Sequence, residues 1–448
     1  MAYTLLLNGQ EDFKLLLIVN LNHIQVNTIE KENIIIAVHY GKRIINLSIP
    51  AGNLVFNLKA NAFPPPEDEA EEIQRALKEP VGCGRLKDIV PPDASVVIMG
   101  DDYTRVTPQE KIIPFVLKEL NEAGVSDGRI KIIIAYGTHR PMTGDEIEKK
   151  YGRELMDRVR ITGHDCHNNL VDKGVTRRGT HIIVNKEVLD ADFRIAVGCV
   201  LPHHPVGWSG GAKMLLPGIA GVKTTNAMHL LGATEQQLGK VSTPCRDEME
   251  DFAREVGLHF ILNVLQTDNG ELLKAVSGHF IDAHREAVSW GEKIYGVPFK
   301  EKADITISSA HPADYDLTQA DKGLFSAELA TKSGGEIILL SPCEEGIAPT
   351  HGKEMARLAR YDDDTLLKKL NMGEVEDPFG VSECMYLNYI KRNFKATLTM
   401  DPVLTNIMGF NYLGADNIQE FIDKRIEAEP DIKIGIVHQS SEVLPRQI

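Results

Sequence analysis

Three short apolar runs, each leading into a polar loop, constrain the fold of this chain more than any other feature. The runs span residues 95–100, 131–137 and 193–200, and helical segments separate them, including 108–124 with Thr107 as its expected N-cap. Buried strands that alternate with helices predict βαβ units and a largely parallel sheet. In such sheets, ligands bind just beyond the carboxyl ends of the strands.

The alternation of strands and helices restarts after about residue 300 and predicts a second domain. We therefore expect two α/β domains with mostly parallel sheets, and an active site at the carboxyl ends of the strands, between the domains. The expected N-terminal catalytic and cofactor-binding domain spans 1–298, and the C-terminal α/β domain spans 299–434, with 435–448 returning to the first domain. Residues 1–33 form an atypical leader that the pattern leaves unexplained.

Composition narrows the class of partner. The formal net charge of −15 disfavours nucleic acid and anionic membranes as partners. The six cysteines are scattered without a C-x-x-C pair, which argues against zinc knuckles and iron–sulfur ligation and fits a reducing compartment. No apolar run is long enough for a membrane span, and the N-terminus lacks a secretory signal pattern. We expect a cytoplasmic protein with a small-molecule substrate.

Side chains that can carry chemistry follow all three apolar runs and should meet at one edge of the sheet. They are Asp102, Arg105, His139, Arg140, His203, His204, Lys213 and His229. Each alone has an ordinary explanation as a cap or a surface group. Together they offer two imidazoles for acid–base work, a guanidinium for a carboxylate or phosphate, a lysine for covalent or phosphate contact, and a histidine for a metal.

The segment 207–211, GWSGG, also satisfies G-x-S-x-G, the nucleophile elbow of α/β-hydrolases. A serine hydrolase built on Ser209 is therefore one alternative. The residues LPHHPV intervene after the strand, however, and Pro217 with Gly218 cuts short any following helix, contrary to that motif. The P-loop pattern fails because Ala212 and Met214 replace required residues. A second alternative is a non-catalytic nucleotide-binding protein of the same fold.

The chain resembles the nickel-dependent lactate racemase family of 2-hydroxy acid racemases and epimerases. The resemblance rests on several motifs that come in the family's order and spacing. They are DDYTR (101–105), GTHRPMT (137–143), HHPVGWSGGAK (203–213), PGIAG (217–221), His229 and QADK (319–322).

The resemblance implies a nickel-pincer nucleotide, pyridinium-3,5-bisthiocarboxylic acid mononucleotide nickel, covalently bound to Lys213 and supplied by cofactor-assembly proteins. It implies that His229 ligates nickel, and that His139 and His203 are the acid–base pair in a proton-coupled hydride transfer. The remaining expected roles fall into two sets. Asp102, Arg105, Ser209, Gly210 and Gly211 would contact the cofactor, and Arg105, Gln319 and Lys322 would bind the substrate carboxylate.

Two positions depart from the family pattern. Val106 stands where the family often has proline, and Thr318 stands where lactate-specific members carry an aromatic residue. Loss of that ring predicts a wider or wetter pocket and a hydroxy acid longer or more polar than lactate. His204 is additional, and we expect it to be an exposed bystander.

Overall fold

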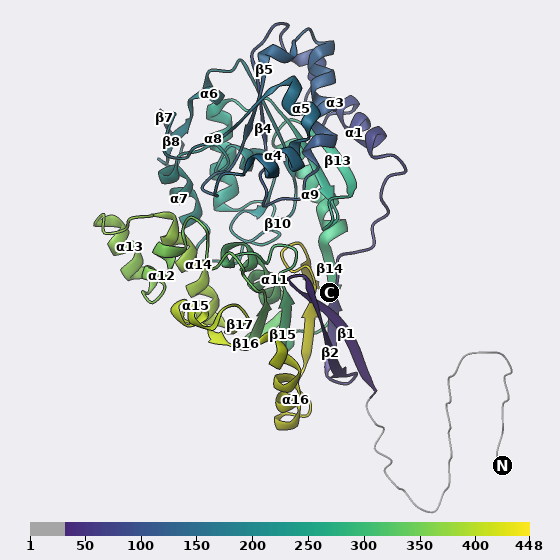
Figure 1. Ribbon diagram of the computed structural model, residues 1–448, viewed down its shortest axis with the longest axis vertical. Coiled ribbons are helices and arrows are strands. Elements are labelled where there is room, and N and C mark those ends of the chain that lie inside the picture. The colour runs from purple at the N-terminus through teal and green to yellow at the C-terminus, as the bar shows by residue number, and fades with distance from the viewer. Residues whose placement is uncertain (1–31) are drawn as a thin grey trace, which may run out of the picture.

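The upper lobe in Figure 1 is built around a six-stranded sheet of order β13-β12-β9-β4-β5-β6. Neighbouring strands are parallel except β12 and β13. The strands are β4 (Val96–Gly100), β5 (Ile130–Ile134), β6 (Arg160–Gly163), β9 (Phe193–Cys199), β12 (Phe260–Gln266) and β13 (Leu272–Gly278). This computed structural model describes residues 32–448, so almost all of the expected leader 1–33 lies outside the described residues.

Helices and short hairpins complete the first lobe. The helices are α1 (Glu69–Lys78), α2 (Leu86–Ile89), α3 (Gln109–Glu122), α4 (Gly144–Tyr151), α5 (Arg153–Arg158), α6 (Lys186–Leu189), α7 (Val222–Leu230), α8 (Pro244–Val256) and α9 (Asp282–Tyr295). The hairpins are β7 (Leu170–Val175) with β8 (His181–Asn185), and β10 (Pro202–His203) with β11 (Gly207–Trp208).

The predicted cap of α3 is wrong. Pro108 is the N-cap residue, and Thr107 makes no capping bond. Instead, the Thr107 hydroxyl donates to Asp101 Oδ2 over 2.5 Å. The hydroxyl proton of Thr107 thus goes to a buried carboxylate, a strong hydrogen-bond acceptor.

The second lobe contains a six-stranded parallel sheet of order β18-β17-β16-β15-β19-β3. The strands are β3 (Leu54–Leu58), β15 (Ala303–Ser309), β16 (Thr331–Leu340), β17 (Lys395–Leu398), β18 (Asn411–Tyr412) and β19 (Ile434–Val437). Its helices are α10 (Leu317–Ala320), α11 (Lys322–Ala330), α12 (Gly352–Leu358), α13 (Asp363–Asn371), α14 (Phe379–Asn393), α15 (Pro402–Ile407) and α16 (Ile418–Ala428).

The N-terminal strands belong to the second lobe, which corrects the expectation that they lie in the first domain. β3 pairs with β19 at the edge of the second sheet. The hairpin of β1 (Asn33–Tyr40) and β2 (Arg43–Pro50) buries Val38 and Leu47 in one apolar cluster with Ile305 of β15. Burying this apolar face against the second sheet stabilises the hairpin there.

The C-terminal strands also differ from the expectation. β19 lies inside the second sheet, and only β20 (Leu444–Gln447) leaves it, to pair with β14 (Gly296–Phe299). The predicted boundary near residue 298 otherwise stays a prediction.

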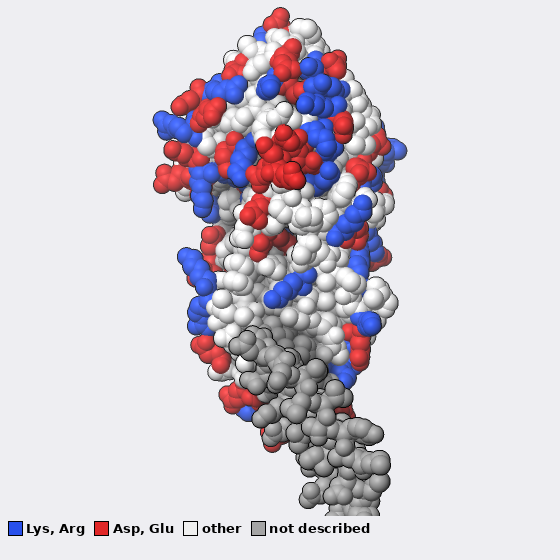
Figure 2. Space-filling view, turned by 90° about the vertical axis from the view of Figure 1, so that its right-hand side faces the viewer, with Lys and Arg blue, Asp and Glu red and all other residues white. Residues whose placement is uncertain are grey.

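The three predicted strands are neighbours, in the order β9-β4-β5. Because they are parallel, their carboxyl ends share one edge, and the loops beyond that edge approach the second lobe (Figure 1). No helix within residues 32–448 is both long and apolar enough to cross a bilayer. On the face shown in Figure 2, acidic and basic side chains of the described residues are interspersed over the upper part of the molecule.

Candidate active site

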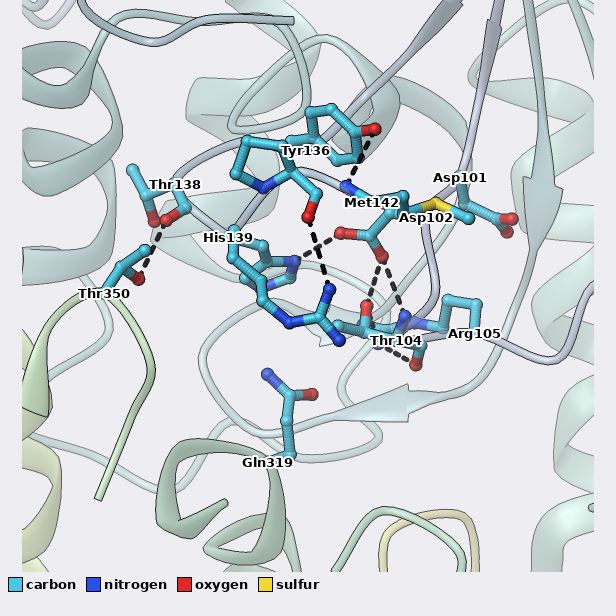
Figure 3. Close-up of polar contacts among 12 residues, drawn as sticks. Asp101, Asp102, Thr104, Arg105, Tyr136, Thr138, His139, Met142, Gln319 and Thr350 are labelled. Carbon is cyan, nitrogen blue, oxygen red and sulfur yellow. Dashed lines mark hydrogen bonds and ion pairs between the residues drawn. The ribbon is translucent and has the colours of Figure 1, made fainter. Parts of the chain in front are cut away.

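One cavity collects the loops that follow the three strands. It includes about 1100 Å³ of space free of atoms, with the open solvent at its mouth counted in. The predicted residues that line it are Asp102, Arg105, His139, Arg140, His203, His204, Ser209, Gly210, Lys213, His229, Gln319 and Lys322. Of the predicted set, only Gly211 is absent from the lining. Gln319 rises from the second lobe toward the loops of the first (Figure 3).

Asp102 and His139 form a dyad at this edge. Asp102 Oδ2 lies 2.7 Å from His139 Nδ1, and Asp102 Oδ1 accepts the backbone N–H and hydroxyl of Thr104 (Figure 3). Although burial opposes ionisation, His139, Thr104 and the charge of Arg105 hold the pKa of Asp102 well below its usual range. A carboxylate only accepts, so His139 Nδ1 donates, and Nε2 is left to accept a proton.

Lys213 and His203 meet deeper in the cavity. Lys213 Nζ lies 2.5 Å from His203 Nε2, and no carboxylate among the described residues pairs with this amine. Burial, together with the charges of Arg105 and Lys322, holds the pKa of Lys213 well below its usual range. Burial and the charge of Lys213 do the same to His203. The neutral form of a lysine is the nucleophilic one.

His229 lies on α7 with its ring against Phe379 of α14, at a centroid distance of 4.8 Å. Its backbone carbonyl accepts the hydroxyl of Tyr386 over 2.6 Å, which ties α7 to the second lobe. Nδ1 of His229 is buried and has no hydrogen-bond partner in the structure. Within residues 32–448, no group of three or more His, Cys, Asp or Glu side chains could hold a metal ion. A metal here would need most of its ligands from a bound group.

Gln319 and Lys322 face the cavity from the second lobe, on α10 and at the start of α11. The Lys322 ammonium donates to Gln319 Oε1. Burial and the charge of Arg105 lower the pKa of Lys322. Asp316 caps α10 by accepting the Gln319 N–H and the Thr318 hydroxyl, so Thr318 points back to the cap. Arg105 from the first lobe and Lys322 from the second thus line the same cavity.

The Ser209 hydroxyl, in the glycine-rich turn of residues 207–211, is hydrogen-bonded to the backbone on both sides. The Ser209 hydroxyl accepts the Leu201 N–H over 2.8 Å and donates to the Cys199 carbonyl over 2.9 Å. This proton is therefore committed to the backbone, no imidazole of the described residues bonds the hydroxyl, and the serine hydrolase alternative is wrong.

Backbone N–H groups of the same turn are mostly used internally. Ser209 N–H donates to Leu201 O, and Gly211 N–H donates to Asn263 Oδ1 over 2.9 Å. A Cβ on Gly210, which has φ of +77°, would lie 2.4 Å from Asn263 Oδ1. The N–H groups of Ser209 and Gly211 are therefore already used within the protein, whereas the Gly210 N–H has no hydrogen-bond partner among the described residues. The expected contacts of this turn with the cofactor stay a prediction.

His204 is buried rather than exposed, which corrects the expectation. Its ring stacks on Phe325 of α11 at 4.0 Å with an interplanar angle of 5°. The second lobe covers this histidine, and no local sequence signal announces a partner more than 100 residues away. Neither of its ring nitrogens has a partner in the structure.

Sequence reasoning also missed residues of the second lobe that complete the cavity. His351 Nδ1 lies 2.5 Å from Asp377 Oδ2, and its Nε2 lies 3.1 Å from the carbonyl oxygen of Thr138, beside His139. Glu383 of α14 lines the cavity as well. The sequence signals His351 only through the Thr-His pair that precedes Gly352. It gives no signal for Glu383, which lies in the interior of a helix.

Residues 40–239 match the family model of the lactate racemase N-terminal domain. A lactate racemase from Thermoanaerobacterium thermosaccharolyticum is 30% identical over 380 residues, which cover 82% of this chain and 88% of that protein. The chain belongs to the lactate racemase family. A lactate racemase from Lactiplantibacillus plantarum is 31% identical over 336 residues, covering 72% of this chain and 78% of that protein.

Solved structures agree with this membership. The lactate racemase apoprotein from T. thermosaccharolyticum superposes with a TM-score of 0.81 at 28% identity, covering 92% of this chain and 100% of that one. A Thermotoga maritima protein shares the fold alone, with a TM-score of 0.66 at 19% identity, covering 87% of this chain and 100% of that one. The predicted family, the α/β fold class and the assignment as an isomerase are confirmed.

Proposed function

We propose that the protein is a racemase or epimerase that inverts C2 of a 2-hydroxy acid by proton-coupled hydride transfer. The placement of His139 and His203 carries the proposal, because two imidazoles from the loops of different strands line one cavity. Each imidazole can take the hydroxyl proton of one enantiomer and return a proton to the other. Asp102 positions His139 through its contact with Nδ1, and this role differs from the cofactor contact that the resemblance implies.

Substrate anchoring falls to three groups. Loss of the hydroxyl proton and of the Cα hydride turns the substrate into a planar 2-oxo acid, and return of both to the opposite face inverts C2. Arg105, Gln319 and Lys322 hold the carboxylate while the oxo group rotates between the two faces, since a forked guanidinium and an ammonium suit a carboxylate. Positioning of this kind lowers the activation free energy by several kcal/mol.

Lys213 and His229 fit the family's nickel-pincer nucleotide. The buried Lys213 amine has no carboxylate partner, and its neutral form can make the covalent thioamide link. The buried, unpartnered Nδ1 of His229 suits nickel beside sulfur donors. Gly210, with its free N–H, can approach the nucleotide closely. When bound, the nucleotide supplies the acceptor that takes the Cα hydride and gives it back.

His229→Ala is expected to lower the nickel bound per protein about tenfold or more, because the only protein ligand to the metal is removed. Metal analysis of the purified protein, produced with the cofactor-assembly proteins, measures this. The adduct on Lys213 should persist in the intact mass. Full nickel content in the variant would contradict the ligand assignment. His279→Ala, at a partly exposed histidine between β13 and α9, is the matched control.

Asp102→Asn is expected to lower kcat about a hundredfold, since the amide no longer fixes the His139 tautomer. The adduct and nickel content should stay unchanged, and steady-state kinetics of the loaded variant gives the ratio. Asp190→Asn, at an exposed carboxylate, is the control. Equal kcat values for Asp102→Asn and wild type would remove Asp102 from the mechanism.

The experiment that tests the function uses a 2-deuterated 2-hydroxy acid in ordinary water. Because a hydride returns without exchanging with solvent, both enantiomers should keep deuterium at C2 after inversion. Mass spectrometry of the separated enantiomers reads the label. Loss of deuterium to solvent in step with inversion would mean abstraction of the Cα proton, and would overturn the hydride mechanism.

We further propose that the substrate is larger or more polar than lactate, because Thr318 replaces the aromatic residue of lactate-specific members. Dependence on cofactor-assembly proteins and a cytoplasmic location stay predictions.

A further inference from the structure

A second cavity adjoins the first on the substrate side. Arg105, His203 and Lys322 line both cavities, whereas Lys213 and His229 line only the first. One of the two acid–base histidines and two of the three carboxylate-binding residues therefore lie between the cofactor side and this second space.

The loops after β15 and β19 form the far wall of the second cavity, with Tyr315 from one loop and Ser441 and Glu442 from the other. β15 and β19 are adjacent parallel strands, so their carboxyl ends meet at one edge. The two lobes thus each present a set of strand ends to the same substrate region.

This wall carries polar atoms that lack partners. The hydroxyls of Tyr315 and Ser441 are buried and have no hydrogen bond in the structure. Glu442 is 7% exposed, and no hydrogen bond or ion pair among residues 32–448 uses its carboxyl group. Buried polar groups without partners are destabilising, so a ligand that pairs with them is favoured.

We propose that the second cavity binds a hydroxyl-bearing tail of the substrate, so that the protein acts on polyhydroxylated 2-hydroxy acids and is an epimerase. This inference rests on the proposed function. Hydroxyls of the substrate both donate and accept hydrogen bonds. They can therefore pair with the hydroxyls of Tyr315 and Ser441 and with the carboxyl group of Glu442. A hydrocarbon tail leaves these groups unpaired. A second carboxylate adds a negative charge to a buried place where one acidic group is already disfavoured, since burial and the charge of Asp268 raise the pKa of Glu442 to about 7.

Three four-carbon acids that differ only in their tails test the proposal on the cofactor-loaded enzyme. Threonate carries hydroxyls, 2-hydroxybutanoate a hydrocarbon and malate a carboxylate. We expect kcat/KM for inversion of C2 to be at least about tenfold higher for threonate than for either of the others, the size of one or more satisfied hydrogen bonds. A preference for 2-hydroxybutanoate or malate would overturn the tail subsite while leaving the racemase function standing.

Two variants then test which side chains cause the preference for threonate. Tyr315→Phe/Ser441→Ala removes only two oxygen atoms and should reduce the preference for threonate over 2-hydroxybutanoate about tenfold. Glu442→Gln removes the charge and should raise malate relative to threonate by a similar factor. Glu429→Gln, at an exposed position, is the matched control and should change neither ratio. Unchanged ratios in the first two variants would contradict the assignment.

A separate outcome concerns the function itself. If the loaded enzyme inverts none of these acids, nor lactate, the proposed function fails. Saturation-transfer NMR with threonate and the full chain then decides the subsite, because binding should weaken in Tyr315→Phe/Ser441→Ala. Equal binding by that variant and wild type would overturn the subsite as well.

Discussion

Lys213→Ala is expected to abolish the nucleotide-sized adduct in the intact mass and to reduce turnover by about 10⁴-fold or more, because the covalent anchor of the cofactor is lost. The fold should survive, since Lys213 has no carboxylate partner that its removal would leave as an unpaired buried charge. Intact-mass spectrometry of denatured protein, produced with and without the assembly proteins, is the measurement.

Lys223→Ala is the control for this result, at an exposed lysine on α7. It should keep both the adduct and the activity. An adduct of unchanged mass on the Lys213→Ala protein would place the attachment elsewhere and contradict the anchor.

His139→Ala/His203→Ala is expected to lose turnover by about 10⁴-fold, because general acid–base catalysis is removed from both faces of the substrate. Each single variant should already lose about 10²-fold or more, and the losses need not add, since the two groups act in one reaction. Chiral chromatography of the reaction mixture measures the rates.

His167→Ala, at an exposed histidine, is the matched control. The adduct on Lys213 should persist in the double variant, which separates lost chemistry from lost cofactor. A loaded double variant that still turns over at the wild-type rate would remove both histidines from the reaction.

The first sheet and its polar edge could be predicted from sequence because their signals are local. The runs that became β4, β5 and β9 are apolar, short and bounded by loop residues, and parallel pairing brings their ends to one edge. Asp102, His139, His203 and Lys213 therefore meet as expected, although their roles depend on the resemblance.

Other parts of the fold depend on contacts that no local pattern encodes. β3 is five residues long, and its place beside β19 depends on pairing across nearly 380 positions. Burial of His204 depends on Phe325, and the reach of His351 to Thr138 depends on how the lobes meet. Likewise, the Ser209 hydroxyl satisfies a catalytic motif in sequence, yet in the folded chain it bonds the backbone.

The most direct test of the central claim is to incubate the cofactor-loaded enzyme separately with each configuration at C2 of a 2-hydroxy acid. Chiral chromatography should show the opposite configuration appearing from both starting points, and both mixtures should converge on one composition. Failure to interconvert any such acid, in protein whose mass and nickel content show a loaded site, would contradict the account.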